Sequence, residues 1–107
     1  MGRREVIVLG WLPLRRVRVR GGSMAPALSD GDVVVAVRRR PRVGDVVLVT
    51  WDARPGQLSV KRAVLRGPDG WHVEGDNRAA STDSRVLGQA RVHAVIPWRL
   101  WPSPGRV

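Results

Sequence analysis

The sequence contains no cysteine and only two histidines, His72 and His93. Without cysteine the chain can form neither a disulfide nor a thiolate site for zinc, and the two histidines lie far from any motif that would supply further ligands. We therefore expect no metal and no other cofactor. The lack of cysteine agrees with a cytoplasmic protein, which is the localisation that we expect, although exported proteins can lack cysteine too.

Phenylalanine and tyrosine are absent as well, and valine dominates the apolar residues. Because β-branched side chains suit a pleated sheet, we expect an all-β, mainly antiparallel fold with little helix and no inserted second domain. A chain of 107 residues is the size of one domain. We expect an N-terminal strand or docking arm over residues 1–14, one domain over 15–96, and a tail of Trp and Pro residues over 97–107 that packs on that domain.

The sequence has no long hydrophobic run. Residues 6–14 are the most apolar stretch, but these nine residues fall well short of the roughly 20 that span a bilayer. No small-x-small cleavage site follows them before Arg15. We therefore expect no transmembrane segment. Peripheral contact with a membrane through Trp11 and its neighbours is an alternative.

Acidic residues are few: nine stand against 19 basic ones, which gives a formal net charge of +10 at pH 7. Such a charge attracts nucleic acid and anionic membranes. The basic residues are spread over the whole chain, however, and the one dense run, at 38–42, has no interleaved aromatic residue on which bases could stack. A basic β module that binds nucleic acid is therefore an alternative and not our main prediction.

Lysine is the scarcest charged residue, because Lys61 is the only lysine among 19 basic residues. Arginine keeps its proton in a protein, whereas a buried lysine can lose it and act as a base. Alternation along a strand predicted at 57–65 places Lys61 on one face with Ser59, Ala63 and Leu65, and Arg62 on the other. Apolar neighbours would desolvate the amine and lower its pKa.

One serine, Ser23, follows two glycines and precedes Pro26 by three residues. Glycine allows positive φ values, and proline fixes the exit from the turn. Residues 16–20 alternate arginine and valine, which predicts a half-buried strand with the valines inward that leads to this turn. The pattern indicates a hydroxyl presented at the end of a strand, although an ordinary connecting loop can have the same composition.

Further strands are predicted at 33–37 and 46–51, each after a Gly-Asp pair, and at 71–74 and 89–96. Gly-Pro-Asp-Gly before the third of these strands is typical of a hairpin turn. Residues 75–85 form a polar loop that carries Asp, Asn, Ser and Arg side chains. So many specific side chains favour a loop that serves a site.

Together these motifs resemble the type I signal peptidase family. The resemblance spans about residues 17–96 and rests on the Ser23 turn, Lys61-Arg62, the Gly-Asp strands, Gly-Asp-Asn-Arg at 75–78 and Ser-Thr-Asp-Ser-Arg at 81–85. It implies a compact signal-peptidase-like catalytic β-fold and a serine endopeptidase with a Ser-Lys dyad. The large inserted domain of longer members has no room in the thirteen residues between Lys61 and Gly75, and their membrane anchor is not expected here.

The resemblance implies a role for each matching residue. Ser23 would be the nucleophile, with its backbone amide as one donor to the oxyanion, and Lys61 would be the general base. Support of the dyad is implied for Ser81, Asp83, Arg85, Asp76 and Asn77. Among these, Ser81 would orient the amine, and an ion pair between Asp83 and Arg85 would hold the loop. Some members add a serine hydroxyl where this chain has Gly21, so the second oxyanion donor is unknown.

The resemblance also implies that the substrate lies extended between the strand at 17–20 and the strand at 58–61, with small residues before the cut. The residues expected to contact it are Val17, Arg18, Val19, Arg20, Gly22, Met24, Leu58, Ser59 and Val60.

Within the family, the short chain, the sequence at 79–85 and the Trp-Pro tail are most similar to the proteases that mature nickel-type superoxide dismutase. This similarity implies removal of an N-terminal leader from that precursor, which would be the partner. General cleavage of signal peptides at a membrane surface is the alternative. A histidine base, His72 or His93, is less favoured because each lies in a strand pattern. The self-cleaving repressors share the dyad but lack the boxes at 75–85.

Overall fold

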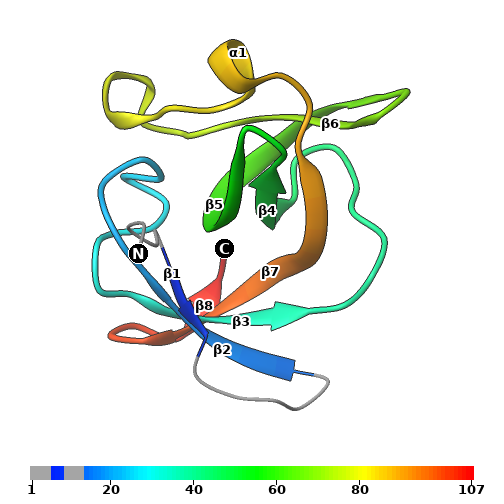
Figure 1. Ribbon diagram of the computed structural model, residues 1–107. Helices are drawn as coiled ribbons and strands as arrows, with labels where there is room; N and C mark the ends of the chain where they lie inside the picture. Colours follow the sequence, from blue (N-terminus) through cyan, green and yellow to red (C-terminus); the bar gives the residue numbers. More distant parts are fainter. Residues whose placement is uncertain (1–5, 9–13) are drawn as a thin grey trace.

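The computed structural model describes residues 6–8 and 14–107, and within them every paired strand is antiparallel (Figure 1). The strands are β1 Val6–Val8, β2 Leu14–Val19, β3 Val33–Val37, β4 Val46–Trp51, β5 Arg54–Gly67, β6 Gly70–Glu74, β7 Arg91–Trp101 and β8 Gly105–Arg106. Helix is limited to the 3-10 turn η1, Arg78–Ala80, and to α1, Ser84–Leu87. The predicted all-β fold is confirmed.

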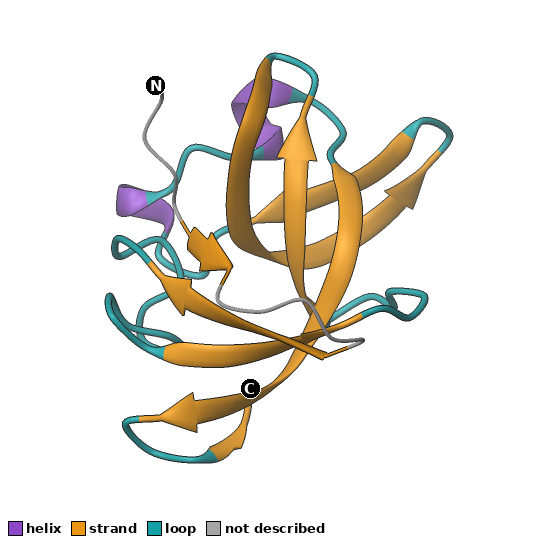
Figure 2. Cartoon of the chain, turned by 60° about the horizontal axis from the view of Figure 1, so that its bottom comes forward, coloured by secondary structure: helices purple, strands orange, loops and turns teal. Residues whose placement is uncertain are grey.

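The strands form one sheet in the order β1-β2-β3-β7-β4-β5-β6, with β8 paired to β7. Figure 2 shows that the long strands bend strongly along their length, so the sheet encloses its own core. Strand β4 lies inside this order, between β7 and β5, and is buried on both faces, which explains its continuous run of apolar residues. Its bounds are those predicted from the sequence.

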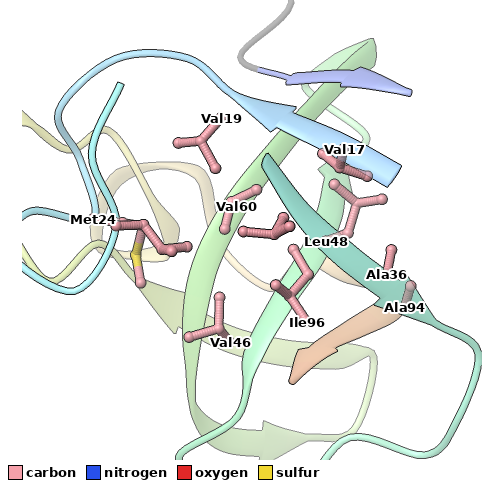
Figure 3. Close-up of a cluster of buried hydrophobic side chains, with 11 residues drawn as sticks. Val17, Val19, Met24, Ala36, Val46, Leu48, Val60, Ala94 and Ile96 are labelled. Atoms are coloured by element: carbon pink, nitrogen blue, oxygen red, sulfur yellow. The ribbon is translucent and has the colours of Figure 1, made fainter. Parts of the chain in front are cut away.

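Two hydrophobic clusters lie on opposite faces of β4. Val46 and Leu48 belong to the first cluster, shown in Figure 3, whereas Val47 and Val49 belong to the second. Full burial of a side chain of this size contributes about 1.5–3 kcal/mol. The alternation of β4 therefore ties both halves of the molecule to one strand.

Strand β2 alternates as predicted: Val17 and Val19 are buried, while Arg16 and Arg18 are exposed. Strand β3 was expected to be wholly buried, but only Val34 and Ala36 are buried, and the other three residues of the strand are half-buried. The difference arises because β3 has the hydrophobic core on one face only.

Strand β5 is longer than predicted and contains an irregularity. Its pairing with β6 shifts register between Ala63 and Leu65, as a β-bulge does. The extra residue turns Leu65 outward, where 64% of its surface is exposed. The prediction that Leu65 shares the buried face of Lys61 is therefore wrong, whereas Ser59 and Ala63 do share that burial.

Strand β7 continues to Trp101, although the sequence predicted that it ends at Ile96 and that a tail follows. Pro97 lacks a backbone N–H, but it falls where the pairing of β7 with β3 shifts register, which is where a sheet tolerates proline. Its carbonyl accepts a hydrogen bond from the N–H of Val107 at 3.2 Å. The chain end thus packs back on β7 through β8.

The described part of the N-terminal segment, β1, pairs with β2 and also lies against β5. Trp11, the residue named for lipid contact, lies outside the described residues. Within the described ranges, no helix has the length and apolarity that crossing a bilayer requires.

Candidate active site

The turn that carries Ser23 begins where β2 ends at Val19. Gly21 has φ +82°, a value that side chains disfavour, and its N–H donates to the Asp30 carboxylate at 2.8 Å. On the other side of Ser23, the Met24 side chain is buried in the first hydrophobic cluster (Figure 3). Ser23 is therefore held, half-buried, between a fixed glycine and a core anchor.

A second loop fixes the backbone of this turn. The N–H of Asn77 donates to the Ser23 carbonyl at 2.8 Å, and the Asn77 side-chain amide donates to the Gly22 carbonyl at 3.1 Å. The predicted supporting residue Asn77 thus contacts the turn that carries Ser23. Its contacts bring the polar loop against residues that are more than fifty positions earlier in the chain.

Gly75 lies at the closest approach of the two loops. A Cβ atom at this position would be 2.6 Å from the Ser23 carbonyl oxygen and 2.3 Å from the Ser81 hydroxyl oxygen. Real Cβ atoms do not come so close to other atoms, so only glycine lets the turn and Ser81 meet here. The sequence placed Gly75 in a motif but gave no signal of this role.

Lys61 is fully buried in the middle of β5, opposite Val47 of β4. Its Nζ donates to the Ser81 Oγ at 3.2 Å. The Ser59 hydroxyl, two residues earlier, is also fully buried and has no hydrogen-bond partner in the described part of the chain. The only lysine of the protein is therefore enclosed in the sheet next to Ser81.

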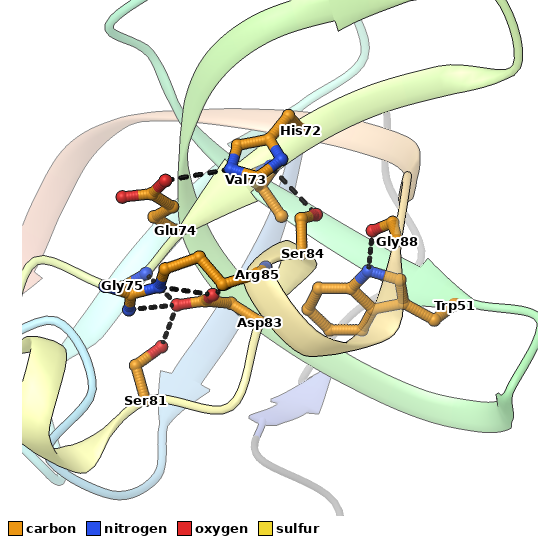
Figure 4. Close-up of polar contacts among 10 residues, drawn as sticks. All are labelled: Trp51, His72, Val73, Glu74, Gly75, Ser81, Asp83, Ser84, Arg85 and Gly88. Carbon is orange, nitrogen blue, oxygen red and sulfur yellow. Dashed lines mark hydrogen bonds and ion pairs between the residues drawn. The ribbon is translucent and has the colours of Figure 1, made fainter.

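The Ser81 hydroxyl belongs to a hydrogen-bonded network around the Asp83 carboxylate (Figure 4). Ser81 Oγ donates to Asp83 Oδ2 at 2.6 Å, and the N–H of Gly75 donates to the same oxygen at 2.9 Å. The Arg85 guanidinium donates to both carboxylate oxygens, at 2.9 and 2.7 Å. Such a bidentate pair is both strong and directional.

Burial by itself would raise the pKa of Asp83, but the hydrogen bonds from Arg85, Ser81 and Gly75 outweigh it and hold that pKa well below the usual range. The hydrogen bond to Asp83 in turn raises the pKa of Arg85. Asp83 is therefore an anion that accepts a hydrogen bond from the Ser81 hydroxyl. Because its proton is directed to Asp83, the Ser81 oxygen faces Lys61 as an acceptor.

Arg62 points away from Lys61, as predicted, and pairs with Asp76. Its guanidinium donates to the two Asp76 oxygens at 3.0 and 2.7 Å and to the Gly44 carbonyl at 2.9 Å. The hydrogen bond with Asp76 raises the pKa of Arg62. The sequence indicated a supporting role for Asp76 but did not reveal that its partner is the residue next to the lysine.

The two histidines have partners of their own. His72 Nε2 lies 2.8 Å from a Glu74 carboxylate oxygen, and His93 Nε2 lies 2.7 Å from the Thr50 hydroxyl. Burial, together with the charge of Arg91, lowers the pKa of His93. Both imidazoles therefore have the contacts of structural histidines.

Most residues expected to contact the substrate are not exposed to it. Four pack in the first hydrophobic cluster, and Ser59 is fully buried as well. The four are Val17, Val19, Met24 and Val60. Leu58 is half-buried, whereas Arg18, Arg20 and Gly22 are exposed. Four of these side chains therefore contribute to the hydrophobic core beneath the strands.

The edge of β2 that was expected to receive the substrate is paired with β1. Val6 lies opposite Val19 and Val8 opposite Val17, while the other edge of β2 pairs with β3. A peptide that adds to β2 as a strand must therefore displace β1. The N–H of Gly21 donates to the Asp30 carboxylate, so it is not free to donate to a substrate oxygen.

The buried Lys61 amine hydrogen-bonds Ser81, in a loop that also hydrogen-bonds the turn that carries Ser23. The family model of signal peptidase, peptidase S26, matches residues 6–74, and the chain belongs to this family. Membership makes the protein a serine peptidase of the class that cleaves leader peptides. The match includes Ser23 and Lys61 and ends before the polar loop. Searches of curated proteins and of solved structures gave no match.

Proposed function

We propose that the protein is a serine endopeptidase in which Ser23 is the nucleophile and Lys61 the general base. The observation that carries the proposal is the link from the buried Lys61 amine to Ser81 at 3.2 Å, in a loop that also hydrogen-bonds the Ser23 turn. Asn77 and Gly75 bring this loop to Ser23. Two segments that are distant in sequence thereby form one site.

The direction of the hydrogen bonds suits Lys61 to accept a proton. Burial penalises a charged amine, which favours the neutral form. A neutral amine that donates one N–H to Ser81 directs its lone pair elsewhere, and the Ser23 hydroxyl is the group from which it would take a proton. Asp83 keeps the Ser81 oxygen available as an acceptor for Lys61, because the Ser81 hydroxyl donates its hydrogen bond to Asp83, with 2.6 Å between the two oxygen atoms.

In the proposed reaction, Lys61 removes the Ser23 proton as Oγ attacks the scissile carbonyl carbon. The backbone N–H of Ser23 donates to the oxyanion of the tetrahedral intermediate. The C–N bond then breaks as Lys61 returns the proton to the leaving amine. Lys61 then deprotonates a water molecule, which attacks the acyl-enzyme carbonyl carbon. The ester C–O bond breaks, Lys61 returns the proton to Ser23 Oγ, and the other half of the substrate leaves as a carboxylic acid.

The proposed substrate is a protein precursor whose N-terminal leader is removed, specifically the nickel-type superoxide dismutase precursor. This choice rests on the resemblance of residues 79–85 and of the Trp-Pro end of the chain to that group of proteases. General signal-peptide cleavage at a membrane is the alternative, and the description of the matched family supports it.

The test is to incubate the protein with the superoxide dismutase precursor and with a secretory precursor in anionic vesicles, and to read new N-termini by mass. Ser23→Ala and Lys61→Met are each expected to abolish cleavage while urea unfolding shows an intact fold. The exposed Ser103 and Arg66 provide the matched controls Ser103→Ala and Arg66→Met. Full activity of Lys61→Met would refute the dyad, and cleavage of only the secretory precursor would favour the alternative.

A further inference from the structure

A cavity of about 590 Å³ opens beside β2 and β5. Its rim carries four arginines: Arg15, Arg38, Arg39 and Arg40. Its floor is apolar and includes Ala36, Leu48 and Ala94, which lie together in Figure 3. The cavity thus combines an apolar floor with a positive rim.

One arginine of this rim has an acidic partner. Arg39 pairs with Asp45 at 3.2 Å. Arg38 and Arg40 are exposed at their positions after β3, and His93, with its lowered pKa, adds a neutral ring to the wall. Several guanidinium groups around one opening favour a ligand with a carboxylate, because guanidinium binds carboxylate with two parallel hydrogen bonds.

The position of the cavity relates it to the proposed active site. Arg15 lies in β2, the strand that leads to Ser23, and Leu58 lies in β5, three residues before Lys61. Three residues of strand span about 10 Å. A peptide that displaces β1 and runs between these two strands from Ser23 would therefore reach the cavity with a side chain several residues from the scissile bond.

We infer that this cavity is a substrate subsite for an acidic side chain located about three to six residues from the scissile bond. The inference rests on the proposed peptidase function and specifies its substrate class. The apolar floor receives the aliphatic part of a glutamate, and the arginine rim holds its carboxylate. The subsite selects an acidic segment beside the small residues expected at the cut.

The test uses synthetic peptides with Ala-Gly-Ala at the centre and Glu, Gln or Lys scanned through the third to sixth positions on either side. The wild-type protein is expected to give a kcat/KM for the best Glu peptide about tenfold above that of its Gln analogue, equivalent to about 1.4 kcal/mol. The double variant Arg38→Glu, Arg40→Glu is expected to reverse the order of the Glu and Lys peptides. Arg66→Glu makes the same type of change on exposed β5 and is expected to keep the wild-type order.

Binding separates this inference from the peptidase itself. Fluorescence anisotropy of the same labelled peptides on the Ser23→Ala protein reports the subsite without hydrolysis. A binding preference for Glu that the double variant Arg38→Glu, Arg40→Glu abolishes supports the subsite, even if no peptide is cleaved. Absence of cleavage would instead refute the peptidase function. Equal cleavage and equal binding of the Glu, Gln and Lys peptides would overturn the subsite alone. Arginine-dependent binding to vesicles of anionic phospholipid, without peptide preference, would overturn it in favour of a lipid surface.

Discussion

Arginine has different roles in the Asp83 network and at the rim of the cavity. Arg85 donates both arms of its guanidinium to Asp83, inside a network whose acceptors are already occupied. Arg38 and Arg40 stand exposed at the rim of a cavity and have space for a further carboxylate. Whether an arginine supports the fold or remains available to a ligand thus depends on its partner, and not on the number of arginines in the chain.

The largest effect on stability is expected from Asp83→Ala, which removes the partner of Arg85. Removing the carboxylate leaves Ser81 and the Gly75 N–H without their acceptor and Arg85 without its anion, and should lower the free energy of unfolding by about 2–4 kcal/mol. Cleavage should fall with it, because Ser81 loses its orientation. Urea unfolding measures the first effect. Asp52→Ala, which removes a carboxylate that is 97% exposed, is the control, and an equal loss in both variants would contradict the network.

Gly75→Ala tests the close approach of the Ser23 turn and Ser81. The new Cβ must push these groups apart, which should cost about 1–3 kcal/mol of stability. A displacement of about 1 Å at the reacting groups should reduce kcat/KM about a hundredfold. Gly105→Ala is the matched control, because no heavy atom lies within 4 Å of its Cβ position. Unchanged kcat/KM in Gly75→Ala would show that the two loops need not meet.

Acid should weaken the Asp83 network and leave the exposed arginines unchanged, because arginine stays protonated at low pH. The folded-state pKa of Asp83 is lowered, so the stability that its charge contributes is present above the ordinary Asp pKa of about 3.9 and is lost as the pH falls through lower values. Urea unfolding at neutral pH and in steps below pH 4 should therefore show wild type approaching the Asp83→Asn variant. A difference that stays constant down to the lowest pH would argue against the ionised carboxylate.

The smallest effect is expected from Arg40→Gln. The side chain is exposed and lies at the cavity rim, so its loss should change the free energy of unfolding by no more than about 0.5 kcal/mol. Thermal unfolding of wild type and variant provides the measurement. A loss of unfolding free energy as large as that of Asp83→Ala would show that Arg40 supports the fold as Arg85 does.

Local pattern predicted several parts of this structure from the sequence. The alternation of β2, the bounds of β4 and the hairpin before Trp71 follow from residue spacing alone. Burial of Lys61 followed from its place in a strand between apolar neighbours.

Features that depend on distant partners were not predicted. The outward turn of Leu65 depends on a bulge against β6, and the continuation of β7 past Pro97 depends on a register shift against β3. The role of Gly75 depends on two loops that meet only in the fold.

The pairing of β1 with β2 also bears on the behaviour of the protein in concentrated solution. A strand edge that can accept an extended peptide can equally accept a strand of another copy, which is how sheets begin to aggregate. In this structure the edge of β2 at Val17–Val19 is covered by Val6–Val8 of the same chain. The tethered strand is always present at high effective concentration, so it outcompetes a second copy of the chain at ordinary protein concentrations. With β1 in place, β2 has both of its edges paired within the chain and offers neither of them to a second copy.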